Sequence, residues 1–277
     1  MASKRWSKAP KLAKWAGEGE GQGRTYVDPF TGKEYPSVTT ILKNTPKEDL
    51  MGWAALKVAE TIIDEYDRIG GDPDQVMQWL PYAHNRYRDE RAWVGSGVHA
   101  TIQAEHEETW DFYELDEEQE QILGQWERFK RIYKVKILLS EFTVLGDDYM
   151  GTADLLFEYT DPFTGEVKIA LGDLKTSKST WEEHHMQIAA LGRAGHIFRE
   201  VPEGTEGAVL HLPKGRPKRE SSWWIKEEMP AYDVAAIIHL RADFWDFIEL
   251  DSELRYEEFM VYLELWKIKQ KIKEALR

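Results

Sequence analysis

The sequence contains no cysteine among its 277 residues. This excludes disulfide bonds, cysteine nucleophiles, cysteine-ligated zinc and iron–sulfur clusters held by cysteine. It also fits a reducing compartment, although exported proteins can lack cysteine as well. No apolar run approaches the roughly 20 residues that a membrane-spanning helix needs, and the basic start lacks the apolar core of a signal peptide. The sequence therefore predicts a cytoplasmic protein that does not insert into a membrane.

The chain also lacks an excess of positive charge, because 36 Lys and Arg stand against 50 Asp and Glu and give a formal net charge of −14. A protein that coats DNA through bulk charge needs a basic face, so this mode of binding is not expected. The acidic residues are unevenly distributed, with a dense group in 105–120 that we interpret as a solvated acidic face. Local engagement of DNA remains compatible with the charge.

Several catalytic motifs are absent as well. The sequence has no G-K-[ST] phosphate-binding loop and no G-x-S-x-G nucleophile elbow. HEETW at 106–110 lacks the second histidine of a zinc-protease helix. His184 and His185 are adjacent, so on a helix they diverge by about 100° and are poorly placed to share one zinc ion. These absences argue against P-loop proteins, serine hydrolases and zinc hydrolases.

Hydrophobic residues make up 42% and aromatic residues 12% of the chain, which is enough for a sizeable core. Residues 1–24 are basic and then glycine-rich, and we expect a disordered tail there. Residues 25–277 are expected to form one domain. It comprises a helical part at about 46–133, a catalytic α/β core at about 134–227 and C-terminal helices at about 231–276.

The spacing of apolar residues assigns the elements. It predicts helices at 50–66, 84–108, 115–133, 179–198, 231–249 and 253–276, with Ser179 or Thr180 as the N-cap of the fourth. It predicts strands at 135–145, 151–159, 167–176 and 207–212. The predicted fold class is α/β, with a central mixed β-sheet flanked by helices.

The pentapeptide DPFTG occurs at 28–32 and again at 161–165, and each copy is expected to close a β-hairpin. A four-residue loop in the second hairpin sets a register that places Asp154 opposite Asp173, with Cβ atoms about 4.5–5.5 Å apart. Like charges at that distance destabilise a sheet. A divalent cation between the two carboxylates would relieve the repulsion.

Lys175 lies two residues after Asp173 and therefore projects from the same face of the strand. Two carboxylates and a lysine at a strand end suit metal-assisted hydrolysis of a phosphodiester, because Mg²⁺ binds carboxylate, water and phosphate oxygens. Lys175 could orient the attacking water or contact the phosphate. The structural alternative is that Asp154 and Asp173 are strand-end carboxylates paired with Lys175.

The order of these residues resembles the PD-(D/E)xK nuclease superfamily, and in detail its RecB-like and phage exonuclease branch. Over roughly 36–212, the resemblance is carried by PSVTTILKNTPKEDLMGWA, GSGVHATIQ with His99, LSEFTV with Glu141, Asp154, the Asp173-Leu174-Lys175 triplet, and HHMQIAALGRA with Gln187. Two positions depart from the family pattern. Ala153 stands where proline is common, and Leu191 replaces the tyrosine of a Gln-x-x-x-Tyr motif.

The resemblance implies a restriction-endonuclease-like core with a helical N-terminal portion, and a Mg²⁺ or Mn²⁺ site without an iron–sulfur cluster. Its implied metal ligands are Asp154, Asp173, the Leu174 carbonyl and His99. Lys175 is the implied catalytic lysine, Gln187 would position water or DNA, and Glu141 is an accessory candidate. The residue-based alternatives are an interior histidine at position 99 and a solvent-facing strand residue at 141.

The implied function is a metal-dependent DNA exonuclease, phage-encoded and active in the host cytoplasm in recombination or repair. DNA is the expected partner, and a recombination or single-strand-binding protein is a further candidate. Candidate DNA contacts are the cations near Trp223 and Trp224 and beside the D-x-K motif, namely Lys178, Lys214, Arg216, Lys218 and Arg219. A solvated loop beside core tryptophans is the alternative there. A nuclease-like scaffold without cleavage activity is the alternative function, and the oligomeric state stays open.

Overall fold

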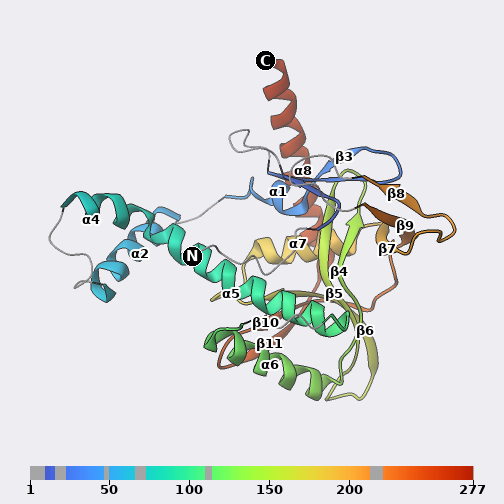
Figure 1. Ribbon diagram of the computed structural model, residues 1–277, viewed down its shortest axis with the longest axis horizontal. Coiled ribbons are helices and arrows are strands. Elements are labelled where there is room, and N and C mark those ends of the chain that lie inside the picture. Colours follow the sequence, from blue (N-terminus) through green and yellow to red (C-terminus); the bar gives the residue numbers. More distant parts are fainter. Residues whose placement is uncertain are drawn as a thin grey trace.

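The computed structural model describes residues 10–15, 23–46, 50–65, 73–109, 114–212 and 221–276. Within these ranges the chain forms an eight-stranded mixed sheet, a three-stranded antiparallel sheet, and helices that cover both faces of the larger sheet (Figure 1). The fold class is therefore α/β, as the sequence predicts.

The large sheet has the strand order β11-β10-β6-β5-β4-β7-β9-β8. β10 runs parallel to β6, and the other neighbouring pairs are antiparallel. A parallel neighbour requires a long crossover, which the chain supplies between β6 and β10. The strands are β4 (Lys136–Leu145), β5 (Met150–Thr160), β6 (Val167–Lys175), β7 (His196–Val201), β8 (Val209–His211), β9 (Ser222–Glu228), β10 (Val234–Leu240) and β11 (Trp245–Leu250).

The helices form two layers with separate hydrophobic cores. One layer packs its apolar residues against one face of the sheet and consists of α1 (Val38–Leu42), α7 (Glu182–Gly192) and α8 (Ser252–Ala275). The other face is covered by α5 (Ala83–His106) and α6 (Glu117–Tyr133). The sheet is thus buried on both sides at its centre, where β5 and β6 lie.

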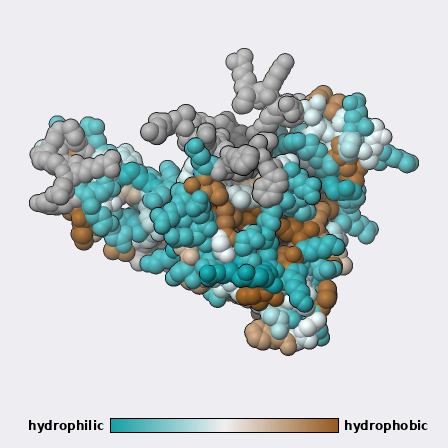
Figure 2. Space-filling view, turned by 60° about the horizontal axis from the view of Figure 1, so that its bottom comes forward, coloured by the Kyte–Doolittle hydropathy of each residue, from teal (hydrophilic) through white to brown (hydrophobic). Residues whose placement is uncertain are grey.

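An arm extends from the body at the left of Figure 1 and consists of α2 (Leu50–Asp64), α4 (Pro73–Trp79) and the 3-10 helix η1 (Leu80–Tyr82). α2 contains no buried residue, and hydrophobic residues lie on the edge of the arm in Figure 2. In the part of the chain that the structure describes, no helix combines the length and the apolarity needed to cross a membrane.

The small sheet is made of β1 (Ala13–Trp15), β2 (Arg24–Val27) and β3 (Glu34–Pro36). Leu12 and Ala13 are buried in a cluster with Phe198 and Trp224. The prediction of a disordered tail is therefore wrong for residues 12–15, because two apolar side chains there are enough to dock a short strand. Arg24, the last residue of the predicted tail, begins β2, and the rest of the tail lies outside the described residues apart from residues 10, 11 and 23.

Both DPFTG segments form the same turn, as predicted. The Asp28 and Asp161 side chains each accept a hydrogen bond of 2.8 Å from the backbone N–H two residues later. Gly32 and Gly165 have φ angles of 71° and 75°, a conformation that favours glycine. The second turn confirms the predicted register of β5 and β6, whose last pair is Leu155 with Gly172. Asp154 and Asp173 follow directly.

Two predicted helices require correction. The segment 231–249 forms β10 and part of β11, because a short apolar run bounded by turns fits a buried strand as well as a helix. The helix predicted at 179–198 ends at Gly192, and residues 196–198 belong to β7. Its N-cap is Trp181, so neither Ser179 nor Thr180 caps it. The other predicted helices and strands are confirmed to within about two residues.

Candidate metal centre

The residues singled out by the sequence meet at the ends of β5 and β6. They come from α5 (His99), β4 (Glu141), β5 (Asp154), β6 (Asp173, Leu174 and Lys175) and α7 (Gln187). α5 and α7 lie on opposite faces of the sheet. The centre is therefore built where the two helical layers and three adjacent strands converge.

His99 is the hub of the first group of contacts. Its Nδ1 atom lies 3.3 Å from Glu141 Oε1 and 3.8 Å from Asp154 Oδ1. One ligand atom from each of these three residues lies within 4.8 Å of the other two. On the other side of the ring, Nε2 lies 3.2 Å from the Leu174 carbonyl oxygen. The three side chains can therefore face one cation while the carbonyl orients the imidazole ring.

Asp173 is the hub of the second group. Its side chain is 1% exposed, and its Oδ2 atom forms an ion pair with Lys175 Nζ but accepts no hydrogen bond of good geometry. Gln187 Nε2 donates to Oδ1 over 3.3 Å. Asp154 is fixed separately, because its Oδ2 accepts a 2.7 Å hydrogen bond from the Leu174 N–H. Asp154 thus keeps Oδ1 toward His99, whereas the two Asp173 oxygens contact Gln187 and Lys175.

Burial and mutual charge perturb the acid–base behaviour of this cluster. Burial raises the pKa of Asp154 and raises the pKa of Asp173 to about 6. Burial opposes the charged form of His99, but the Asp154 and Glu141 carboxylates outweigh it and raise the pKa of His99 to about 9. Burial likewise opposes the charge of Lys175, and the two aspartates outweigh it and raise its pKa. Without a cation, the cluster therefore holds protons strongly.

Glu141 has an unusual backbone for a strand residue. Its φ angle is 47°, and it lies between the ladder pairs Ser140–Leu155 and Phe142–Ala153. A non-glycine residue in this left-handed region costs about 1–2 kcal/mol. The ladder register is the same before and after Glu141, so the distortion is confined to the residue whose carboxylate meets His99. Such strain inside a strand is typical of residues positioned for function.

The sequence-based search missed polar residues that extend the site beyond Gln187. Arg24, Thr39 and Thr152 line a hollow of about 20 Å³ next to it, enough for one water molecule. The Tyr26 hydroxyl lies 2.8 Å from Oγ1 of Thr152, one of the residues that line this hollow. Only the register of the small sheet brings Arg24 to this place, so no local sequence pattern would have indicated it.

Of the five candidate DNA contacts, the structure describes only Lys178. Lys178 is exposed on the loop after β6, which is held by hydrogen bonds from Arg241 to the Thr176 carbonyl (2.8 Å) and between His239 and the Ser177 carbonyl (2.7 Å). Trp224 is buried in the core with its Nε1 donating to Ser222, so it is no stacking platform. The remaining cations, Lys214, Arg216, Lys218 and Arg219, lie outside the described residues.

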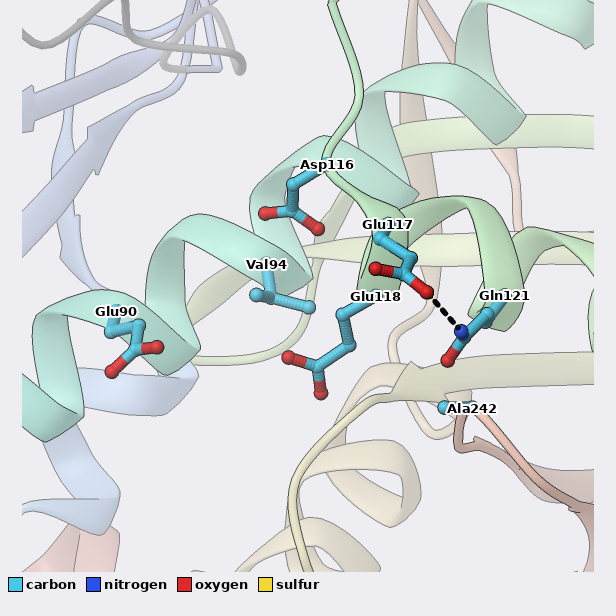
Figure 3. Close-up of a pocket in the computed structure, with 7 residues that line it drawn as sticks. All are labelled: Glu90, Val94, Asp116, Glu117, Glu118, Gln121 and Ala242. Atoms are coloured by element: carbon cyan, nitrogen blue, oxygen red, sulfur yellow. Dashed lines mark hydrogen bonds between the residues drawn. The ribbon is translucent and has the colours of Figure 1, made fainter. Parts of the chain in front are cut away.

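A larger hollow of about 580 Å³ lies elsewhere, between α5, α6 and the loop after β10 (Figure 3). Its lining contains none of the predicted site residues and consists of Glu90, Val94, Asp116, Glu117, Glu118, Gln121 and Ala242. Arg91 forms two hydrogen bonds to the Glu118 carboxylate, at 2.6 and 2.7 Å. Arg91 therefore compensates the Glu118 carboxylate of this acidic lining.

Neither a comparison with models of protein families nor a comparison with curated protein sequences gives a match for this chain. Support for a function therefore comes from the residues of the centre, from their geometry and from the motif resemblance.

Proposed function

We propose that this chain is a Mg²⁺- or Mn²⁺-dependent deoxyribonuclease that hydrolyses phosphodiester bonds, with an exonuclease favoured over an endonuclease. We further propose that β4, β5, β6 and α7 form a restriction-endonuclease-like core, and that the enzyme acts on DNA in recombination or repair in the cytoplasm of a phage-infected host. The observation that carries the proposal is the convergence of Asp154, Asp173 and Lys175 with His99 and Glu141 at one sheet end.

The donor set fits a divalent cation. Three carboxylates, those of Glu141, Asp154 and Asp173, face only two cationic groups, His99 and Lys175. Oxygen-rich sets with one imidazole suit Mg²⁺ and Mn²⁺. In the described geometry the converging ligands are His99 Nδ1, Glu141 and Asp154. Asp173 and the Leu174 carbonyl, which the family resemblance adds, lie outside this group, because Asp173 contacts Lys175 and Gln187 and the carbonyl faces His99 Nε2.

When bound, the cation would lower the pKa of a coordinated water molecule and neutralise charge on the scissile phosphate. The remaining steps belong to the chain. The Lys175 ammonium, held by Asp173, can donate a hydrogen bond to the attacking water or to a phosphate oxygen. Gln187 keeps the Asp173 carboxylate from rotating. The Leu174 carbonyl keeps His99 Nδ1 turned toward the carboxylates, so each group is positioned before DNA arrives.

The proposal is tested by incubating the purified protein with end-labelled single- and double-stranded linear DNA in Mg²⁺, Mn²⁺ or EDTA. Lys175→Ala and Asp154→Asn should abolish cleavage. Lys168→Ala, on β6 like Lys175, and Glu158→Gln, on β5 like Asp154, are matched controls outside the centre. Both control variants should cleave DNA like the wild type. Release of mononucleotides from ends indicates an exonuclease, whereas cutting of closed circles indicates an endonuclease.

Two results would contradict the proposal. One is the absence of metal-dependent cleavage by the folded wild type, which together with DNA binding would favour the scaffold alternative. The other is equal cleavage by Lys175→Ala, which would assign the activity to a contaminant or to another part of the chain.

A further inference from the structure

The long C-terminal helix α8 is apolar on two opposite faces. Phe259 and Leu263 are fully buried, and Tyr256, Met260 and Trp266 pack around them against the body. On the opposite face, five large apolar side chains are 51% to 82% exposed and a sixth is half-buried. We call this set the outer stripe, and it consists of Leu254, Val261, Leu265, Ile268, Ile272 and Leu276.

The outer stripe has the spacing of a coiled-coil seam. Val261, Leu265, Ile268 and Ile272 follow one another at intervals of four, three and four residues, and Leu254 lies seven residues before Val261. An apolar repeat with this mean period of 3.5 residues faces a partner helix in a two-stranded coiled coil. A helix that only covers a body would carry polar residues on this face. The last turns of α8 also extend beyond the body in Figure 1.

The charges along α8 are divided between its two halves. Residues 253–264 carry Arg255 and four glutamates, and residues 267–274 carry Glu274 and four lysines, so the two segments have formal charges of −3 and +3. The glutamates are Glu253, Glu257, Glu258 and Glu264, and the lysines are Lys267, Lys269, Lys271 and Lys273. Two such helices side by side repel when parallel, because like halves then meet. They attract when antiparallel, because each acidic half meets a basic half. The helix is therefore complementary in charge to its own reversed copy.

We propose that α8 pairs antiparallel with α8 of a second copy of this chain and forms a two-fold symmetric dimer. One register satisfies both the apolar spacing and the charges. It stacks Leu265 on Ile268 of the second copy and Val261 on Ile272 of the second copy, and it sets Glu264 beside Lys271 of the second copy. The pairing is reciprocal, as a two-fold axis requires. Each body stays on the outer side, since Phe259 faces away from the seam.

The first test is the mass of the full chain in solution by sedimentation equilibrium between about 1 and 100 µM. We expect twice the monomer mass of 32.3 kDa and conversion to monomer by Ile268→Glu or Ile272→Glu. Ile63→Glu, at an exposed apolar position on α2, is the control and should leave the dimer intact. A wild type that is monomeric over this range overturns the proposal, as does a dimer that survives both stripe substitutions.

Charge reversal tests the direction of the pairing without removing an apolar side chain. Glu264→Lys alone and Lys271→Glu alone should each weaken dimerisation roughly tenfold, because two symmetry-related pairs become repulsive. The double variant Glu264→Lys with Lys271→Glu restores opposite charges and should recover the dimer. Failure of the double variant to recover it, with its helix content intact by circular dichroism, contradicts the register.

The absence of native cysteine allows a direct geometric test. In the antiparallel pair, position 261 of one copy meets position 272 of the other. The same position in the two copies lies 11 residues apart along the seam, about 16 Å. Val261→Cys with Ile272→Cys should therefore form an intermolecular disulfide, whereas either single variant should not. A disulfide in a single variant shows a parallel pair and overturns the proposal. A monomer whose single cysteines resist alkylation shows that another segment covers the stripe, which also overturns it.

Discussion

The candidate metal centre and the large hollow of Figure 3 are both acidic, but their carboxylates differ in burial and in the groups that compensate their charge. In the hollow, the Glu118 side chain is 31% exposed and paired with Arg91, and Glu117 accepts a hydrogen bond from Gln121. In the centre, Asp154 and Asp173 are 10% and 1% exposed. The carboxylates of the larger cavity remain partly exposed, and the Glu118 charge is paired with Arg91. In the smaller site, by contrast, two aspartates are buried close together.

This difference supports the proposal that the smaller site carries the function. Burying a carboxylate is costly unless cationic groups and hydrogen bonds compensate. The centre adds a second cost, because Glu141 adopts a left-handed backbone. Folding alone requires neither the burial of these carboxylates nor the left-handed backbone of Glu141. The residues that line the hollow show neither feature. The predictions below compare substitutions at the two places.

The largest difference is expected in DNA cleavage. Asp173→Asn removes the charge that holds Lys175, and we expect the cleavage rate to fall at least about 1,000-fold. Glu117→Gln in the hollow should leave the rate within about twofold of wild type, because that carboxylate contacts none of the site residues. Initial rates on end-labelled DNA in Mg²⁺ measure both variants, and similar losses in the two would erase the distinction between the regions.

The second difference is expected in cation binding. Mn²⁺ should raise the thermal midpoint of the wild type, because an ion that binds only the folded state stabilises it. Asp154→Asn should weaken Mn²⁺ binding at least about 100-fold by titration calorimetry, while Glu118→Gln should not change it. If Asp154→Asn binds Mn²⁺ as tightly as the wild type, the ion binds at another site.

The third expected effect is the pH dependence of stability in EDTA. The folded-state pKa of His99 is raised from 6.5 to about 9, so its contribution is fully present below pH 6.5 and is lost as the pH rises through 9. We expect the free energy of unfolding to fall by up to about 3 kcal/mol over that window. His99→Gln should flatten the decline in urea titrations. An unchanged slope in His99→Gln would show that the imidazole is not held charged by the cluster.

The smallest expected effect concerns backbone strain. Glu141→Gly should stabilise the metal-free protein by up to about 1 kcal/mol, because glycine accepts a positive φ. It should also weaken Mn²⁺ binding. The matched change Glu158→Gly, in the regular part of β5, should destabilise by about 0.5–1 kcal/mol. If Glu141→Gly lowers the free energy of unfolding as much as Glu158→Gly does, the backbone of Glu141 is not strained and this part of the account is wrong.

Much of the centre was predictable because its information is local. The DPFTG turn sets the register of β5 and β6, and strand alternation then brings Asp173 and Lys175 together. The family resemblance indicated His99 and Glu141 as candidates, but their contact depends on the tertiary packing of α5 and β4 and was not predicted. The positive φ of Glu141 has no sequence signal, because glutamate rarely adopts it.

The parts that failed depend on distant partners. β10 was predicted as a helix, and its identity as a strand depends on parallel pairing with β6, about 60 residues earlier. β1 is three residues long and forms only because β2 offers it an edge. β7 begins directly after Gly195, so the apolar spacing predicts that its residues continue α7, although α7 ends at Gly192. Short elements of this kind are decided by packing and not by their own periodicity.

The most direct test of the central claim is the divalent-cation dependence of DNA cleavage by the wild type and by Asp154→Asn. Both proteins are compared under conditions in which circular dichroism shows them to be folded. We expect end-labelled linear DNA to be degraded by the wild type in Mg²⁺ or Mn²⁺, to remain intact in EDTA, and to remain intact with Asp154→Asn in every condition. Cleavage that persists in EDTA, or that proceeds equally in Asp154→Asn, would contradict a catalytic metal centre at the ends of β5 and β6.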